Sequence, residues 1–170
     1  AIAVMVGDEA QASSGADLDP AGKKRLSEID VELSTLTLRY GQNVLDSSNA
    51  FELVIDDRAR LAGLPEGAVD AARASAEQKG VAGYRFTLQA PSYVPLLTYL
   101  DDAGIRETMY RAYNSRATAG ALDNRPIIKS ILELRREKAK ILGFATFADL
   151  VLEDRMARSG GAARRFVQTL

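Results

Sequence analysis

The sequence contains no histidine and no cysteine, and these two absences exclude much of the chemistry that small enzymes use. Without histidine the chain lacks the commonest general base and metal ligand, and it cannot form a Ser-His or Cys-His catalytic arrangement. Without cysteine it has no disulfide and no thiolate metal site, which fits a reducing compartment. The acidic residues show no calcium-loop spacing. We therefore expect this chain to contain no catalytic, cofactor-binding or metal-binding residue.

An excess of one charge and long apolar runs are also missing. The 22 Lys and Arg are balanced by 23 Asp and Glu, so no surplus of positive charge would attract nucleic acid or anionic lipid. No run approaches the roughly 18 uncharged residues of a membrane helix, and the first ten residues lack the basic start of a signal peptide. We expect a cytoplasmic protein with no nucleic-acid partner and no membrane association.

The composition that is present is that of a globular protein, because 46% of the 170 residues are hydrophobic and 26% are charged. We expect a mainly α fold, a helical bundle with a long N-terminal helix and a small two-stranded β element. Residues 1–19, rich in Ser, Gly and Asp, are expected to be flexible, and residues 20–158 to form the helical domain. Residues 159–170 predict the start of a truncated helix, because their apolar positions continue without a stop signal.

The helical pattern is clearest in residues 123–150, which predict two helices separated by a turn. Asp123 or Asn124 is expected to cap the first helix, and Pro126 lies in its first turn. Gly143 is the expected left-handed stop, and Thr146 is expected to cap the second helix. Apolar residues at spacings of three, four and seven predict one buried stripe: Ile127, Ile128, Ile131, Leu132, Leu134, Ile141 and Leu142. In the second helix we expect four inward residues, Phe147, Leu150, Val151 and Met156.

A longer helix is predicted to begin at Asp19 and Pro20. Its apolar seam consists of Leu26, Ile29, Leu33, Leu36, Tyr40 and Val44. Such a seam can face the interior of a bundle, or it can bind a helix of another chain. A cluster of helix breakers at 46–49 is expected to end the helix.

The middle of the chain predicts two strands and two helices. Residues 50–56 and 84–90 alternate apolar and polar side chains, so they predict strands that pair with each other. Between them, an Ala-rich helix begins at Pro65 and stops at Gly80. Pro95 is expected to interrupt the apolar segment 93–100, and a further helix should follow over 105–117.

Four features could carry chemistry, and in each case a structural role is the better interpretation. Adjacent acids before a helix act as caps more often than as catalytic dyads: Asp56, Asp57, Asp101 and Asp102. Interleaved charges indicate a solvated, salt-bridged face: Arg135, Arg136, Lys138 and Lys140 with Glu133 and Glu137. Tyrosines at helical spacing favour the core over a peptide groove: Tyr93, Tyr99, Tyr110 and Tyr113. Residues 159–165 lack the spacing and the Lys-Ser/Thr pair of a phosphate loop.

Six stretches stand in a characteristic order and spacing: LSEIDVELSTLTLRYGQNVLD, LAGLP, GYRFTLQAPSYVPLLTY, IRETMYRAYNSRA, DNRPIIKSILELRREKAKILGFATFADL and LEDRMA. Over about residues 15–158, the chain resembles the region ahead of the catalytic core in the zinc metallopeptidases that include thimet oligopeptidase, oligopeptidase A and the bacterial peptidyl-dipeptidases. The short link between NSRA and DNRPII is more similar to the peptidyl-dipeptidase branch than to oligopeptidase A.

The resemblance implies a mostly helical, two-lobed enzyme whose deep channel admits short peptides and excludes folded proteins. Its zinc would be held by two His of an H-E-x-x-H helix and a downstream Glu, and none of these residues matches a position here. We therefore expect a fragment of an intracellular oligopeptidase or peptidyl-dipeptidase that forms part of the channel wall and is inactive alone. A missing catalytic region would follow residue 170, and zinc and short peptides would bind only to the full-length enzyme.

Two alternatives remain open from the sequence. The chain could be a free-standing helical protein-interaction module without catalytic activity, in which the seam from Leu26 to Val44 and the apolar end bind a partner. It could also be an enzyme that uses only Asp, Glu, Lys and Tyr. Exposed apolar patches would favour self-association of the fragment.

Overall fold

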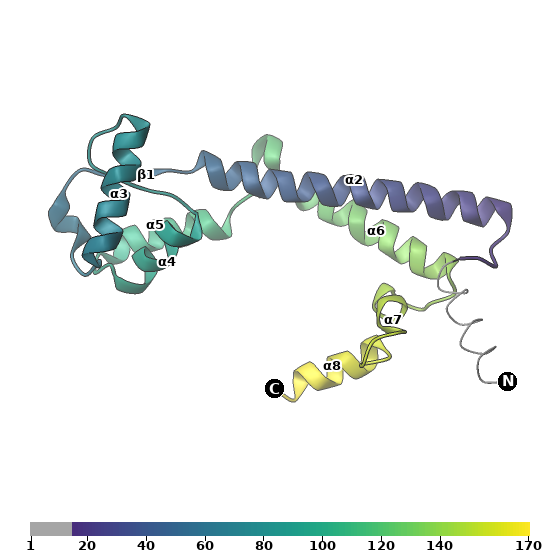
Figure 1. Ribbon diagram of the computed structural model, residues 1–170. Coiled ribbons are helices and arrows are strands. Elements are labelled where there is room, and N and C mark those ends of the chain that lie inside the picture. Colours follow the sequence, from purple (N-terminus) through teal and green to yellow (C-terminus); the bar gives the residue numbers. More distant parts are fainter. Residues whose placement is uncertain (1–14) are drawn as a thin grey trace. The chain divides into compact units, whose positions relative to one another are not determined.

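The computed structural model describes residues 15–170, which are mainly helical with one two-stranded sheet (Figure 1). The elements in chain order are α2 (Pro20–Ala50), β1 (Leu53–Ile55), η1 (Arg58–Leu61), α3 (Glu66–Lys79), β2 (Tyr84–Phe86), α4 (Ala90–Tyr99), α5 (Ala103–Asn114), η2 (Gly120–Leu122), α6 (Arg125–Ile141), α7 (Phe147–Leu152) and α8 (Gly160–Gln168). The predicted fold class is confirmed. Most of the predicted flexible segment 1–19 lies outside the described residues.

The chain divides into two compact units. Ala1–Arg39 together with Arg125–Leu170 form unit 1, which the structure describes from residue 15 onward, and Tyr40–Asn124 form unit 2. α2 contributes its first part to unit 1 and its last part to unit 2. The predicted domain limits at 19/20 and 158/159 stay predictions.

Unit 2 is organised around the strand pair. β1 and β2 are antiparallel, with Leu53 opposite Phe86 and Ile55 opposite Tyr84, so the predicted pairing is confirmed. α3 packs against β2, and α4 lies against both α3 and α5 (Figure 1). The best-buried members of this core are Leu61, Val69, Phe86, Leu96, Leu100 and Met109. A ribbon of two short strands is marginal in water, and here the packed helices stabilise it.

The predicted interruption at Pro95 is wrong, because α4 continues through this residue to Tyr99. Proline cannot donate a backbone hydrogen bond, but in the second turn of α4 it removes only the donor for the carbonyl of Pro91. Leu96 and Leu100 lie on the buried side, where they are at most 2% exposed. Burial of this apolar face therefore outweighs the missing bond.

The end of α2 also differs from the prediction, because residues 46–49 lie inside the helix. The Ser48 hydroxyl donates to the carbonyl of Val44 at 2.7 Å, and the Ser47 hydroxyl accepts from the backbone N–H of Ala117 at 3.1 Å. These contacts satisfy the serines without a break in the helix. Tyr40, a member of the predicted buried seam, is 39% exposed.

In unit 1, one face of α6 is buried, as predicted. Ile127, Ile131 and Leu134 are at most 9% exposed, and Ile29 of α2 is fully buried. The predicted stripe is too broad, however, because Ile128 and Leu132 are 42% and 57% exposed. Each lies one position after a buried isoleucine and is therefore rotated by about 100° around the helix.

Gly143 ends α6 as predicted, with φ +82°. The N–H of Phe144 donates to the carbonyl of Ala139 at 2.9 Å, and that of Gly143 to Lys140 at 3.2 Å, which together form a Schellman motif. The predicted cap of α7 is confirmed, since Thr146 accepts from the N–H of Asp149. The sequence predicts that Val151 and Met156 point inward, but both are exposed. Val151 faces away within α7, and Met156 lies beyond the end of this helix.

Candidate functional site

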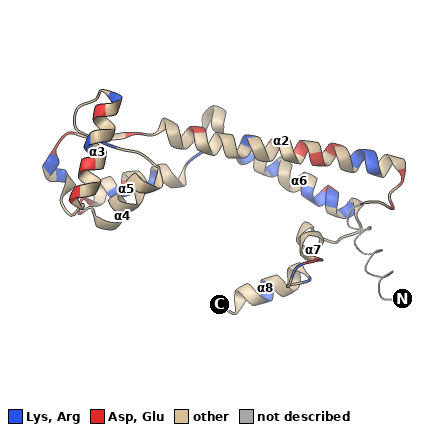
Figure 2. Ribbon diagram, viewed as in Figure 1, with Lys and Arg blue, Asp and Glu red and all other residues tan. Residues whose placement is uncertain are grey.

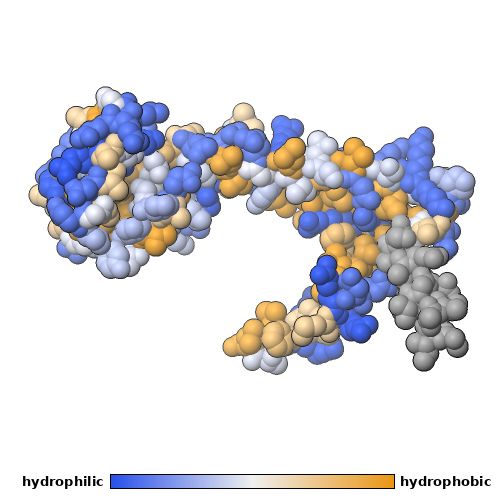
Figure 3. All heavy atoms as spheres, in the orientation of Figure 1, coloured by the Kyte–Doolittle hydropathy of each residue, from blue (hydrophilic) through white to orange (hydrophobic). Residues whose placement is uncertain are grey.

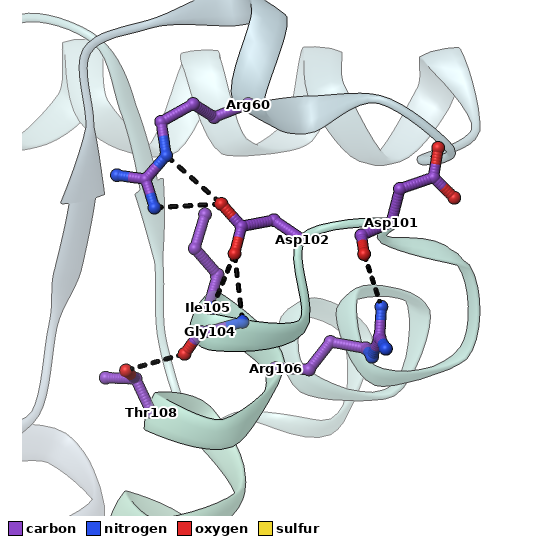
Figure 4. Close-up of polar contacts among 7 residues, drawn as sticks. All are labelled: Arg60, Asp101, Asp102, Gly104, Ile105, Arg106 and Thr108. Carbon is purple, nitrogen blue, oxygen red and sulfur yellow. Dashed lines mark hydrogen bonds and ion pairs between the residues drawn. The ribbon is translucent and has the colours of Figure 1, made fainter.

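Asp102 caps a helix and pairs with an arginine. Its Oδ1 accepts from the backbone N–H groups of Gly104 and Ile105, both at 3.0 Å, at the start of α5. Its Oδ2 accepts from Nη2 and Nε of Arg60 at 2.9 and 3.2 Å (Figure 4). The Arg60 guanidinium, followed by the N–H of Ile105, holds the pKa of Asp102 below its ordinary value. A carboxyl kept ionised in this way is unsuited to act as a general acid near pH 7.

Asp101 does not join Asp102 in a dyad, because the two carboxyl groups point apart (Figure 4). The backbone of Asp101, rather than its carboxylate, makes the hydrogen bonds that hold this residue in place. Its N–H donates to the carbonyl of Ala62 at 2.9 Å, and its own carbonyl accepts from Nη1 of Arg106 at 2.9 Å. The same arginine nitrogen also contacts the carbonyl of Leu100. This cluster fixes the chain between α4 and α5.

In the other acidic pair, one member has a structural role. Asp57 caps η1, because its carboxylate accepts from the N–H of Ala59 at 2.8 Å. Asp56 lies beside Gly83, where a Cβ would come within 2.9 Å of its Oδ1 and 2.7 Å of the carbonyl oxygen of Ile55. Both aspartates are exposed. The predicted capping role is confirmed for Asp57 and Asp102.

The charged face of α6 pairs mainly with α2. Nζ of Lys138 lies 2.6 Å from Oδ1 of Asp30, and Oε1 of Glu137 lies 2.6 Å from Nε of Arg25, both partners being in α2. The guanidinium of Arg135 instead stands 5.0 Å from the ring centre of Phe147 in α7. Figure 2 shows basic residues along α6 and residues of both signs along α2. The sequence predicted a salt-bridged face but placed its partners within the helix, where the pair at 4.0 Å is Lys129 with Glu133. Partners on α2 were missed because they lie about a hundred residues earlier.

The four tyrosines do not line one groove. Tyr93 and Tyr113 stack with ring centres 4.3 Å apart, and the guanidinium of Arg116 lies 3.6 Å from the ring centre of Tyr113. Both rings pack against the core of unit 2, and burial raises the pKa of Tyr93. Tyr99 and Tyr110 are 54% and 57% exposed. The prediction of core packing is therefore correct for the first two and wrong for the last two.

The glycine-rich turn at 159–165 starts α8, and it already faces a carboxylate. Ser159 caps the helix by accepting from the N–H of Ala162 at 3.2 Å. The N–H of Gly160 donates to Oδ1 of Asp149 at 2.9 Å, and Oδ2 accepts from the Thr146 hydroxyl at 2.6 Å. The Thr146 hydroxyl, followed by the N–H of Gly160, lowers the pKa of Asp149. An acidic side chain of the same chain thus takes the place where a phosphate would bind.

No group of acidic side chains within residues 15–170 is arranged to hold a metal ion. Nor does any helix of this described region have the length and apolar character needed to cross a membrane. Among the residues singled out from the sequence, Asp57 and Asp102 act as caps, Lys138 forms an interhelical ion pair, and Tyr93 and Tyr113 pack against a core. These contacts hold helices in position.

Comparison with known proteins identifies similarity to peptidases. The sequence model of peptidase family M3 matches residues 96–170. Oligopeptidase A of Haemophilus influenzae is 46% identical over 151 residues, which are 86% of this chain and 22% of that protein. Oligopeptidase A of Escherichia coli is 43% identical with the same coverage of both chains. The dipeptidyl carboxypeptidase of Salmonella typhimurium is 35% identical, over 91% of this chain and 23% of its own length.

The chain therefore spans about a fifth of the length of these curated relatives. The resemblance to the zinc metallopeptidases that include oligopeptidase A and the peptidyl-dipeptidases is confirmed. Identity over the whole matched region is higher with oligopeptidase A than with the dipeptidyl carboxypeptidase. The closer similarity of the link before residue 123 to the peptidyl-dipeptidase branch stays a prediction.

Proposed function

We propose, on the basis of the resemblance to peptidase family M3, that this chain is one segment of a zinc metallopeptidase that hydrolyses short peptides. The observation that carries the proposal is similarity to oligopeptidase A that extends over most of the chain. Such an enzyme would act in the cytoplasm, and the absence of cysteine fits a reducing compartment.

The residues of this chain do not fit a zinc site. The sequence has no histidine or cysteine. The carboxylates of Asp102 and Asp149 are engaged in helix caps, and that of Glu137 in an ion pair. In the proposed enzyme the zinc and its H-E-x-x-H helix belong to the rest of the polypeptide. This segment then takes no part in bond cleavage.

The role that we propose for the segment is to form part of the wall of a channel for short peptides. Two features support a wall. The α2 and α6 helices of unit 1 are joined by ion pairs, and unit 2 has a continuous hydrophobic core. Both features hold helices in fixed positions, which a channel that excludes folded proteins requires. Peptides would meet exposed side chains of these helices rather than a reactive group.

A chimera tests the proposal. The homologous 151-residue segment of Haemophilus influenzae oligopeptidase A is replaced by the matching residues of this chain. We expect the chimera to hydrolyse a quenched short peptide, and a chelator to abolish the activity. The isolated chain with zinc should give no turnover. Chelator-sensitive hydrolysis by the isolated chain, or a folded chimera without activity, would contradict the proposal. A chimera with the H-E-x-x-H glutamate changed to glutamine is the control.

A free-standing interaction module is the second candidate. It is favoured by large apolar side chains that are at least 66% exposed: Val31, Leu38, Met156, Phe166, Val167 and Leu170. In that case the chain would bind a partner without any peptidase core, and the chimera would be inactive. The same experiment therefore separates the two functions.

A further inference from the structure

We propose that a helix from the remainder of the peptidase polypeptide packs on the outer face of α2. The outer face consists of Ser27, Val31, Ser34, Thr35 and Leu38, all in unit 1 and all exposed. This inference rests on the proposed function, and it names the surface through which this segment joins the rest of the enzyme.

The first step is that α2 is apolar on two opposite sides. Ile29 lies on the side of the predicted seam and is fully buried, while Val31 and Leu38 are 66% and 75% exposed. Two positions along an α-helix correspond to a rotation of about 200°, so Val31 points away from Ile29. Figure 3 shows hydrophobic residues at the surface along α2. A helix that is apolar on both sides is typical of one that is covered on both sides.

The second step is that the outer face is uncharged and shallowly hollowed. The Thr35 hydroxyl donates to the carbonyl of Val31 at 2.9 Å, so it is satisfied inside the helix. The two serines are small and allow another backbone to approach closely. An open groove of about 700 Å³ runs along this part of α2, and four of its nine lining residues belong to the outer face: Ser27, Val31, Ser34 and Thr35. Gly15, Ala16 and Leu26 line the rest, together with Lys23 and Asp30, whose opposite charges leave the groove without a net charge.

The third step identifies the occupant. An uncharged face does not attract nucleic acid or an anionic surface. Two copies of this chain would need roughly 800 Å² on each partner for a stable interface, and five side chains on three turns of one helix do not provide it. A helix of the same polypeptide needs less area, because it loses no translational freedom on packing. The relatives have about four-fifths of their length outside the matched segment, so in the proposed enzyme most of the polypeptide is available to cover this face.

The test compares Val31→Asp and Leu38→Asp in two proteins, the isolated chain and the chimera with oligopeptidase A. In the isolated chain both side chains are exposed, so we expect the thermal midpoint to stay unchanged. In the chimera the aspartates would be buried without a partner, so the midpoint should fall by several degrees, and peptide hydrolysis should fall with it. Glu32→Lys, an exposed charge change on the same helix, is the control and should leave both proteins unchanged.

The outcomes are distinguishable. An active wild-type chimera whose midpoint is unaffected by either substitution would overturn this inference and leave the proposed function intact. An inactive wild-type chimera would overturn the proposed function and this inference with it. An isolated chain that is a dimer, and that becomes a monomer on Leu38→Asp, would show that a second copy occupies the face and would also overturn the inference.

Discussion

Arg25 of α2 and Glu137 of α6 form a bidentate ion pair, although 112 residues separate them in the sequence. Nε lies 2.6 Å from Oε1, and Nη2 lies 2.8 Å from Oε2. The Arg25 guanidinium holds the pKa of Glu137 below its ordinary value. Both side chains are 41% exposed, so solvent screens their attraction. The paired geometry nevertheless sets the register of one helix against the other.

We expect this pair to be energetically coupled. Arg25→Gln and Glu137→Gln should each lower the urea midpoint slightly, and the double variant should lose less than the sum of the two. The coupling should shrink in about 0.5 M salt because the pair is partly exposed. Glu28→Gln removes the 3.5 Å contact of Arg25 within α2 and serves as the control with a smaller effect. Strictly additive losses at low salt would show that the pair is not formed in solution.

Asp102 should contribute a pH-dependent part of the stability of unit 2. Its pKa in the folded state lies below the ordinary value of 3.8, so the stabilisation is present above about pH 4 and is lost as the pH falls through the folded value. Asp102→Asn keeps a capping side chain but removes the charge that faces Arg60. The difference in urea midpoint between the wild-type chain and Asp102→Asn should therefore shrink between about pH 5 and about pH 2.

The control for this pH experiment is Asp101→Asn, because the contacts of Asp101 with Ala62 and Arg106 are made by backbone atoms. The urea midpoint of Asp101→Asn should differ little from that of the wild-type chain at any pH. A difference for Asp102→Asn that is the same at neutral and acidic pH would mean that its charge does not contribute.

Two neighbouring residues of α6 test the buried face. Ile131 is 9% exposed and Leu132 is 57% exposed. Ile131→Asp buries an unpaired charge and should cost about 3–5 kcal/mol, enough to unfold unit 1, whereas Leu132→Asp should change stability by less than about 0.5 kcal/mol. Thermal melts followed by circular dichroism measure both. A cooperative melt at an unchanged temperature for Ile131→Asp would rule out the buried face.

Two glycines of unit 2 separate backbone strain from crowding. Gly63 and Gly80 have φ of +88° and +73°, so alanine is strained at either position. At Gly80 a Cβ would meet no other atom, and Gly80→Ala should cost about 1–2 kcal/mol. At Gly63 a Cβ would overlap the carbonyl oxygen of Tyr99, so Gly63→Ala should cost about 1–3 kcal/mol more. Equal urea midpoints for the two variants would contradict this order.

Local signals in the sequence predict most helix ends correctly. Pro65 and Gly80 bound α3, and Gly143 ends α6, because a cap or a left-handed residue acts on the backbone within one turn. The caps Asp57 and Asp102 follow the same rule. The sequence is therefore sufficient to interpret those candidate sites whose role depends only on capping.

Side-chain partners far apart in the chain cannot be predicted in this way. Asn124 is one of the two predicted caps of α6, but its Oδ1 accepts from Asn43 at 2.8 Å and its Nδ2 donates to the carbonyl of Tyr40 at 3.0 Å. Spacing likewise cannot predict that Tyr93 of α4 stacks on Tyr113 of α5. Both depend on which helices pack together, and a one-dimensional pattern does not contain that information.

The division into a continuous unit and a discontinuous one has a consequence for synthesis on the ribosome. Tyr40–Asn124 is a single stretch and can fold as soon as it emerges. Glu137, the partner of Arg25, is synthesised 112 residues later. At about 5–20 residues per second, this delay is on the order of ten seconds. During that interval the apolar seam around Ile29 is without its α6 partner. The apolar seam in the first half of α2 is therefore uncovered while the intervening residues are made, and a chaperone that recognises apolar helices would have time to bind there.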